Sequence, residues 1–169
     1  MNASAAPVRV FVSYTHDDAP HKAHVAAFVD DLRANGIDAR FDRDVHGTPP
    51  EGWPRWMEKE VASAVFVLVV CTETYLRRYE QREELGKGKG ATWESAIIRQ
   101  EMYDNAGQNS KFAAVLLDPK DEVYIPQPLR PHTHYVYSQA RTDLLRWLTD
   151  QPAYVPRPLG KVPILPPDP

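Results

Sequence analysis

Apolar segments separated by polar turns divide this chain into alternating strands and helices. The most apolar segment, residues 64–71, is rich in β-branched side chains and shows no polar alternation. It predicts a strand that is covered on both faces, which is typical of the centre of a parallel sheet. Shorter apolar segments predict four further strands, at residues 8–14, 37–42, 111–117 and 133–137.

Apolar residues spaced three or four positions apart predict helices between these strands. The helices are expected to follow the turn at Asp17 and Asp18, to start near Trp53, to cover residues 93–105 and to contain residues 144–148. This order of elements predicts a flavodoxin-like, doubly wound α/β fold with five parallel strands flanked by helices. In such folds ligands bind beyond the carboxyl ends of the strands.

Composition divides the chain into three parts. Residues 1–7 lack the charged and apolar regions of a signal peptide and are expected to be a disordered N-terminus. Residues 8–150 are expected to fold as one domain. Residues 151–169 contain seven of the sixteen prolines. This predicts an extended linker or tail that leads into a C-terminal sensor or regulatory domain.

Charge and cysteine content restrict the classes of function. A formal charge of −3 and a pI near 6.1 provide no basic surface, so neither nucleic acid nor a membrane is an expected partner. The single cysteine, Cys71, ends the most apolar segment and is expected to be a buried, unreactive thiol in a reducing compartment. We therefore expect a cytoplasmic protein. No metal site and no cofactor are expected, because the histidine pairs have no third ligand nearby in sequence.

A polar segment from residue 72 to residue 92 interrupts the regular pattern. It contains a charged run and then the glycine-lysine stretch 86–90, and a short helix is expected only in its first half. Residues 86–91 match the spacing G-x-G-x-x-A, but they follow charged residues and not a strand, so they do not fit a dinucleotide-binding fingerprint. A mobile lid or hinge is the better interpretation.

Several motifs in this order resemble the TIR superfamily, and most of all its SEFIR branch. They are Val10–Asp18 (VFVSYTHDD), Gly36–Asp42 (GIDARFD), the glycine and proline loop that leads into Trp56–Met57, and Val67–Tyr75 (VLVVCTETY). The resemblance covers residues 8–150. It implies a flavodoxin-like sheet of five parallel strands, in agreement with the order of elements derived from the hydrophobic pattern.

The resemblance implies two functions. Many family members are interaction modules that pair like with like in signalling, whereas many bacterial and plant TIR domains hydrolyse NAD+ once they self-assemble. We expect a self-associating effector that cleaves NAD+, its substrate, at the nicotinamide-ribose bond in bacterial antiphage defence or cell-death signalling. The alternative is a non-catalytic adaptor that acts through homotypic contacts. A phospho-acceptor receiver is a third interpretation, for which Asp17 and Asp18 are only partial candidates.

The resemblance also implies that Glu94 is catalytic, because the enzymatic members use a glutamate at the start of the third helix. A single carboxylate suffices, since nicotinamide is cationic in NAD+ and departs as a neutral molecule without a general acid. A helix amino terminus would favour the ionised carboxylate. Two alternatives remain: Glu101, two turns later, could take this role, or Glu94 could be a solvent-facing residue of the first turn.

Residues at the strand ends are expected to approach Glu94. Arg43 could bind a pyrophosphate, and Tyr14 or Trp93 could stack on a base. Alternatively, Arg43 could pair with a neighbouring aspartate, and Trp93 could fill the core with Ala96, Ile97 and Tyr103. The candidate substrate-binding residues are Ser13, Tyr14, Arg43, Asp44 and Trp93. The loop after the second strand makes subunit contacts in the family, which implies self-association through His46, Gly47, Pro49 and Trp53.

Overall fold

The computed structural model describes residues 6–80, 89–104 and 109–169, with side chains described in α4 from Ile97 onward. Its strands form one sheet in the order β2-β1-β3-β4-β5, and every neighbouring pair is parallel. The strands are β1 (Arg9–Ser13), β2 (Asp38–Arg40), β3 (Phe66–Val70), β4 (Phe112–Leu116) and β5 (His134–Val136). This is the strand order of flavodoxin-like folds, so the predicted fold class is confirmed.

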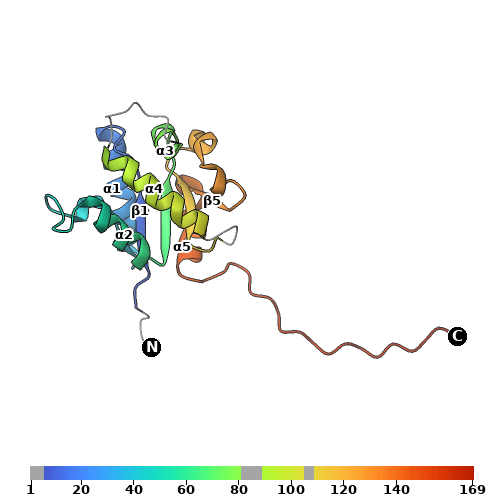
Figure 1. Cartoon of the computed structure of the whole chain (residues 1–169). Coiled ribbons are helices and arrows are strands. Elements are labelled where there is room, and N and C mark those ends of the chain that lie inside the picture. Colours follow the sequence, from blue (N-terminus) through green and yellow to red (C-terminus); the bar gives the residue numbers. More distant parts are fainter. Residues whose placement is uncertain (1–5, 81–88, 105–108) are drawn as a thin grey trace.

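Helices cover both faces of the sheet (Figure 1). The helices α1 (Ala19–Ala34) and α5 (Tyr137–Leu148) pack on one face. The helices α2 (Trp53–Ser63), α3 (Glu73–Tyr79) and α4 (Lys89–Asp104) pack on the other. Chain connections of this kind place the loops after β1 and β3 on opposite faces, which opens a crevice between two neighbouring strands at their carboxyl ends.

Strand residues alternate between two hydrophobic cores. Val10 and Val12 of β1 face α1, where Phe28 is buried. Phe11, between them, faces α2 and packs edge-on against Trp56 with ring centroids 6.0 Å apart. Both sets of strand residues are buried because helices cover both faces, and this is why the central strands lack polar alternation.

Two helices that begin at the carboxyl edge of the sheet, α1 and α3, have side-chain N-caps. Asp18 accepts a hydrogen bond from the backbone N–H of His21 at 2.8 Å, and Pro20 occupies the first turn of α1. Thr72 caps α3 in the same way by accepting from the backbone N–H of Tyr75 at 3.1 Å. Capping residues satisfy amide groups that have no partner within the helix. The cap expected at Asp17 or Asp18 is therefore made by Asp18.

Some local predictions differ from the structure. The helix expected at residues 93–105 is α4 and begins at Lys89. Tyr103, expected on its buried side, is 80% exposed, whereas Ile98 is fully buried. The segment between β4 and β5, for which no regular element was expected, contains the 3-10 helices η2 (Pro119–Tyr124) and η3 (Gln127–Leu129). A helical stripe is narrow, so a shift of a few residues in its phase moves a side chain from core to solvent.

Two predicted segments lie wholly or largely outside the described residues. These are residues 1–7, expected to be a disordered N-terminus, of which 1–5 are not described, and the glycine-lysine stretch 86–90, interpreted as a lid or hinge, of which 86–88 are not described. Residues 151–169, in contrast, are described: they contain no helix or strand, and each is exposed. None of the helices in the described part of the chain is long and apolar enough to cross a bilayer.

Candidate functional site at the carboxyl edge of the sheet

Hydroxyl groups connect the carboxyl ends of β1 and β3. Ser13 and Tyr75 are buried, and their hydroxyl oxygens lie 2.9 Å apart. The hydroxyl oxygens of Thr15 and Thr72, which follow the same two strands, are 3.3 Å apart. These contacts join residues that are 57 or more positions apart in the sequence, so they fix the loops after β1 and β3 relative to each other.

Asp42 connects the end of β1 to the loop after β2. The Tyr14 hydroxyl donates to its Oδ1 at 2.6 Å, and His16 Nε2 lies 2.6 Å from its Oδ2. Burial raises the pKa of Asp42, but hydrogen bonds from His16 and Tyr14 outweigh this effect and hold the pKa below its usual range. The ionised carboxylate therefore anchors the start of the loop that follows β2.

These contacts define what Ser13 and Tyr14 do in this structure. Both were expected to touch a substrate, and both do lie at the carboxyl edge, but their side chains are buried. Their hydroxyl groups bond to Tyr75 and Asp42 and so position the edge. A ligand would reach them only after these side chains moved.

The short 3-10 helix η1 (Asp42–Asp44) contains the other two predicted binding residues of this region. Arg43 is exposed at the rim. The Asp44 carboxylate accepts a hydrogen bond from the backbone N–H of Phe41 at 2.9 Å, so this side chain stabilises the turn. The Arg43 side chain is therefore accessible to a ligand, whereas the Asp44 side chain stabilises the loop.

The loop between η1 and α2 presents an aromatic side chain to solvent. Gly47 and Gly52 have φ angles of 77° and 83°, in the left-handed region that suits glycine. His46 is exposed and Pro49 is buried. Trp53 is 38% exposed and packs edge-on against Trp56 with ring centroids 5.5 Å apart. This packing holds the exposed indole in place on the surface.

Glu94 lies near the start of α4. Because α4 leads into β4, which begins at the amino edge, the start of α4 lies toward the carboxyl edge. Because α4 begins at Lys89, Glu94 is the sixth residue of the helix and lies in its second turn. The field of a helix terminus acts mainly within the first turn, so the expected electrostatic stabilisation of an ionised Glu94 is weaker than the sequence suggested. The side chains of Glu94 and Trp93 are outside the described part of the structure.

A cleft of about 880 Å³ opens at the switch point between β1 and β3. It lies between the start of α1, the start of α3 and η2, and its lining includes Asp17, His21, Glu73, Arg77 and Asp121. Burial raises the pKa of Asp121, as do the Asp118 and Asp17 carboxylates, against the opposing influence of Lys120 and His21. The cleft thus combines several carboxylates with basic side chains.

The residues that follow β1 and β3 can be compared with what a phospho-acceptor receiver requires. A receiver of this fold needs a phospho-acceptor carboxylate, and acidic residues do gather near the end of β1 in this cleft. The position directly after β3, however, is occupied by Cys71 and Thr72. The carboxylates of this cleft come from the turn between β1 and α1, from the start of α3 and from the segment that contains η2.

Cys71 is buried, and burial, together with nearby Asp121, raises the pKa of its thiol far above the usual range. The expectation of a buried thiol is confirmed, and this environment disfavours the reactive thiolate. Within residues 6–80, 97–104 and 109–169, no group of three or more histidine, cysteine, aspartate or glutamate side chains could hold a metal ion.

Comparison with known proteins agrees with this architecture. The SEFIR domain family profile matches residues 8–148. A crystal structure of a prokaryotic SEFIR domain is similar to 82% of this chain and 96% of its own, with 25% identity and a TM-score of 0.63. A metazoan TIR-STING receptor from C. gigas shares the fold over 88% of this chain and 43% of its own, with 16% identity and a TM-score of 0.59. No curated protein gives a significant match.

The fold and these matches define a TIR-type domain, a class of signalling interaction domains. Within that class, the chain belongs to the SEFIR domain family. The resemblance found in the sequence motifs is thereby confirmed. The match ends at residue 148, so the proline-rich tail lies outside the family domain.

Reasoning from sequence missed the residues that hold this edge together. Asp42, His16, Thr72 and Tyr75 carry the contacts, and none was singled out as a site residue. The sequence does indicate that Ser13 is buried, because the two-residue period of β1 places it on the same buried face as Phe11. Its partner Tyr75 is 62 positions away and is reached only through the order of the strands.

Proposed function

We propose that this SEFIR domain is a self-associating effector that cleaves NAD+ at the nicotinamide-ribose bond, with Glu94 as the catalytic carboxylate. The observation that supports it is the sheet order β2-β1-β3-β4-β5, because it gathers the loops after β1 and β2 at one edge. The chain enters α4 from this same edge, after β3 and α3. This topology supports a site in which Glu94 and Arg43 act together near the rim formed by His16 and Asp42.

The chemistry requires little from the protein. The C1′–N bond of NAD+ breaks, its electron pair returns to the pyridinium nitrogen, and neutral nicotinamide leaves. An ionised Glu94 stabilises the oxocarbenium character of the ribose and orients its hydroxyl groups. Water then attacks C1′ and loses a proton to give ADP-ribose, whereas attack by a group of the same molecule gives a cyclic product. In this proposal Arg43 binds the pyrophosphate, which its exposure to solvent supports.

Self-association completes the site in this proposal. The loop 45–52 and Trp53 project from the edge that contains η1, and the indole is held by Trp56. Partly exposed aromatic side chains with fixed orientation are typical of protein interfaces. Contact between loops of neighbouring copies would order the rim next to Glu94 and raise the rate with protein concentration. Activation on assembly suits a role in antiphage defence or cell-death signalling.

The test is nicotinamide release from NAD+ by concentrated or artificially clustered protein. Wild type is expected to release nicotinamide, and Glu94→Gln is expected to reduce the rate by roughly a hundredfold or more, because it removes the charge that stabilises the transition state. Glu58→Gln is the matched control, since Glu58 is an exposed carboxylate on α2. It should leave the rate unchanged.

The outcomes separate the two catalytic assignments. Equal rates for wild type and Glu94→Gln would remove Glu94 from the mechanism. A loss confined to Glu101→Gln would move the role two turns along α4, to its last turn, and would therefore place the site away from the carboxyl edge; Glu101 is partly buried. Clustered wild type that releases no nicotinamide would refute the enzymatic proposal altogether.

The second candidate is a non-catalytic homotypic adaptor. The burial and mutual bonding of Ser13, Tyr14 and their partners support it, because these side chains are bonded within the domain and not directed at a ligand. It predicts concentration-dependent association that Trp53→Ala weakens, with NAD+ left intact. Sedimentation of wild type and Trp53→Ala, with NAD+ measured in the same samples, distinguishes the adaptor from the enzyme.

A further inference from the structure

The C-terminal tail exposes more apolar surface than a spacer needs. Its large apolar side chains are 74–101% exposed: Tyr154, Val155, Leu159, Val162, Ile164 and Leu165. The residues 152–167 also contain Arg157 and Lys161 but no acidic residue. Flexible or rigid spacers are usually built from polar residues, glycine and proline. Exposed apolar side chains interspersed with prolines instead fit a segment that binds a groove in polyproline conformation.

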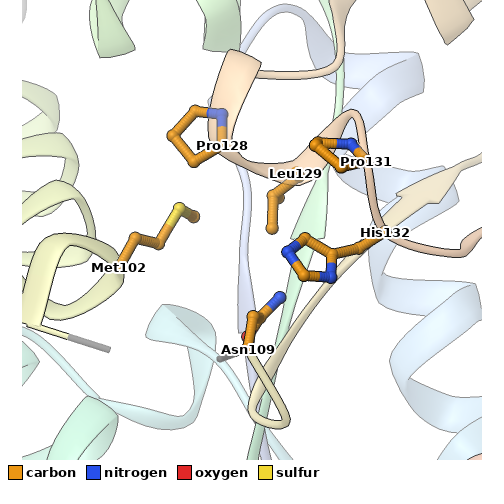
Figure 2. Close-up of a pocket in the computed structure, with 6 residues that line it drawn as sticks. All are labelled: Met102, Asn109, Pro128, Leu129, Pro131 and His132. Atoms are coloured by element: carbon orange, nitrogen blue, oxygen red, sulfur yellow. The ribbon is translucent and has the colours of Figure 1, made fainter. Parts of the chain in front are cut away.

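The domain has an apolar pocket near the point where this tail begins. The pocket has a volume of about 300 Å³ and is lined by Met102, Asn109, Pro128, Leu129, Pro131 and His132. Figure 2 shows the Met102, Leu129 and proline side chains surrounding the open space. Asn109 precedes β4 and His132 precedes β5, so the pocket lies at the amino edge of the sheet. The helix α5 runs back from β5 and ends at this same edge.

The chemistry of the tail and of the pocket match. A pocket of this size accommodates one or two aliphatic side chains, and its proline and leucine walls offer apolar contact. The last turn of α4 beside Met102 contains Glu101 and Asp104 and no basic residue. Acidic groups are unfavourable at the carboxyl end of a helix, where the backbone carbonyls concentrate negative charge. Lys161, three residues before Ile164, could approach this acidic turn.

Arg130, the cation that lies between two pocket prolines in the sequence, is bonded to a nearby backbone carbonyl. Its Nε donates to the carbonyl oxygen of Ile125 at 3.0 Å, which directs the side chain back onto its own backbone. Arg157 and Lys161 give residues 152–167 a charge opposite to that of the acidic turn of α4, and Asp168 follows outside this segment.

We propose that the tail of one copy docks in the amino-edge pocket of a second copy, with Ile164 and Leu165 entering it. Figure 1 shows the tail leaving the end of α5 and extending away from its own domain. Every tail residue is exposed, so the tail makes no stable contact with its own pocket. At about 3.1 Å per residue, the tail reaches on the order of 50 Å, which is enough to span to a neighbour.

Proline reduces the conformational freedom that docking removes. Segments restricted to an extended conformation lose less entropy on binding than flexible ones. The contact joins different surfaces of the two copies, so it can repeat from copy to copy. It lies at the edge opposite to the proposed NAD+ site and does not depend on catalysis. Its test is therefore made in protein that contains Glu94→Gln.

The experiment places a photo-crosslinker in the tail. Leu165→p-benzoylphenylalanine is introduced into the full chain, and equal amounts of ¹⁵N-labelled and unlabelled protein are mixed before irradiation. Mass spectrometry should find crosslinks from position 165 to Met102 or to residues 128–132. Light–heavy pairs should be present, because they join tails and pockets of different copies. Pairs formed only within one copy, crosslinks only to other surfaces, or no crosslinks would each overturn the proposal.

Sedimentation equilibrium of tail variants provides an independent measurement. Ile164→Asp combined with Leu165→Asp should weaken the tail-dependent association by roughly tenfold or more, since two buried aliphatic groups are lost. The control is Val123→Asp, because Val123 is 69% exposed on η2 outside the pocket. Pro131→Asp should weaken association from the pocket side. A mixture of the tail and pocket variants should associate, because each supplies the part that the other lacks; failure to do so contradicts the pairing.

Discussion

The two edges of the sheet are built in opposite ways. At the carboxyl edge, side chains from β1, β2, β3 and their loops bond to one another, as in the Ser13–Tyr75 and Tyr14–Asp42 pairs. At the amino edge, an apolar pocket stays open while a tail with exposed aliphatic side chains leaves nearby. The carboxyl edge is held together within one molecule, whereas the amino edge offers surfaces that a second molecule can cover.

This difference separates the residues that position the carboxyl-edge loops from the exposed apolar residues, at Trp53 and at the amino edge, that are proposed to join copies. Polar contacts buried at the carboxyl edge hold the loops in register, because a buried hydroxyl or carboxylate without a partner is costly. Apolar surface at the amino edge carries no such constraint on geometry. It contributes free energy when it is removed from water, and so it favours association without shaping the carboxyl edge.

Removing the Asp42 carboxylate should give the largest change in stability at the carboxyl edge. Asp42→Ala takes away the acceptor of the Tyr14 hydroxyl and the partner of His16. We expect the free energy of unfolding to fall by about 1–3 kcal/mol, as for other buried hydrogen bonds to a charged group. Urea unfolding measures it. Asp30→Ala is the control, because Asp30 is an exposed carboxylate on α1, and it should change stability little.

The pH dependence sharpens this prediction. The pKa of Asp42 is lowered from 3.8 in the folded protein, so its carboxylate stabilises the fold at pH values above the unfolded-state pKa. This stabilisation decreases as the pH falls through the folded-state pKa. The difference between wild type and Asp42→Ala should therefore shrink on acidification below about pH 4. A difference that grew in acid would contradict the assignment of Asp42 as the ionised anchor.

Removing the tail should have the smallest effect on stability. A chain that ends at Asp150 loses only exposed residues, and the SEFIR match ends at residue 148. The free energy of unfolding is expected to change by less than about 0.5 kcal/mol, as for other surface changes. Thermal unfolding at low protein concentration measures it without a contribution from association. A loss of several degrees in melting temperature would show that the tail packs on its own domain.

The hydrophobic pattern predicted the fold because its main strands are buried on both faces. β3 and β4 are almost entirely buried, and such strands stand out as uninterrupted apolar segments. The start of α4 was misplaced because Lys89 and Gly90 resemble a loop, whereas helix boundaries depend on caps and tertiary contacts. The short 3-10 helices η2 and η3 have too few residues to produce a periodic pattern.

The candidate site was predictable in location and less so in detail. Parallel strands bring their carboxyl ends to one edge, so Tyr14 and Arg43 could be assigned to it from the sequence. Which side chains are buried there depends on distant partners such as Tyr75 and Asp42. The sequence does not specify those pairings until the strand order is known.

The dependence of nicotinamide release on protein concentration tests the central claim most directly. If self-association completes the site, the rate per molecule should rise with concentration and reach a plateau as assembly saturates. Glu94→Gln should assemble over the same range and remain inactive. A rate per molecule that is constant across this range, or an equal rate from Glu94→Gln, would contradict the account.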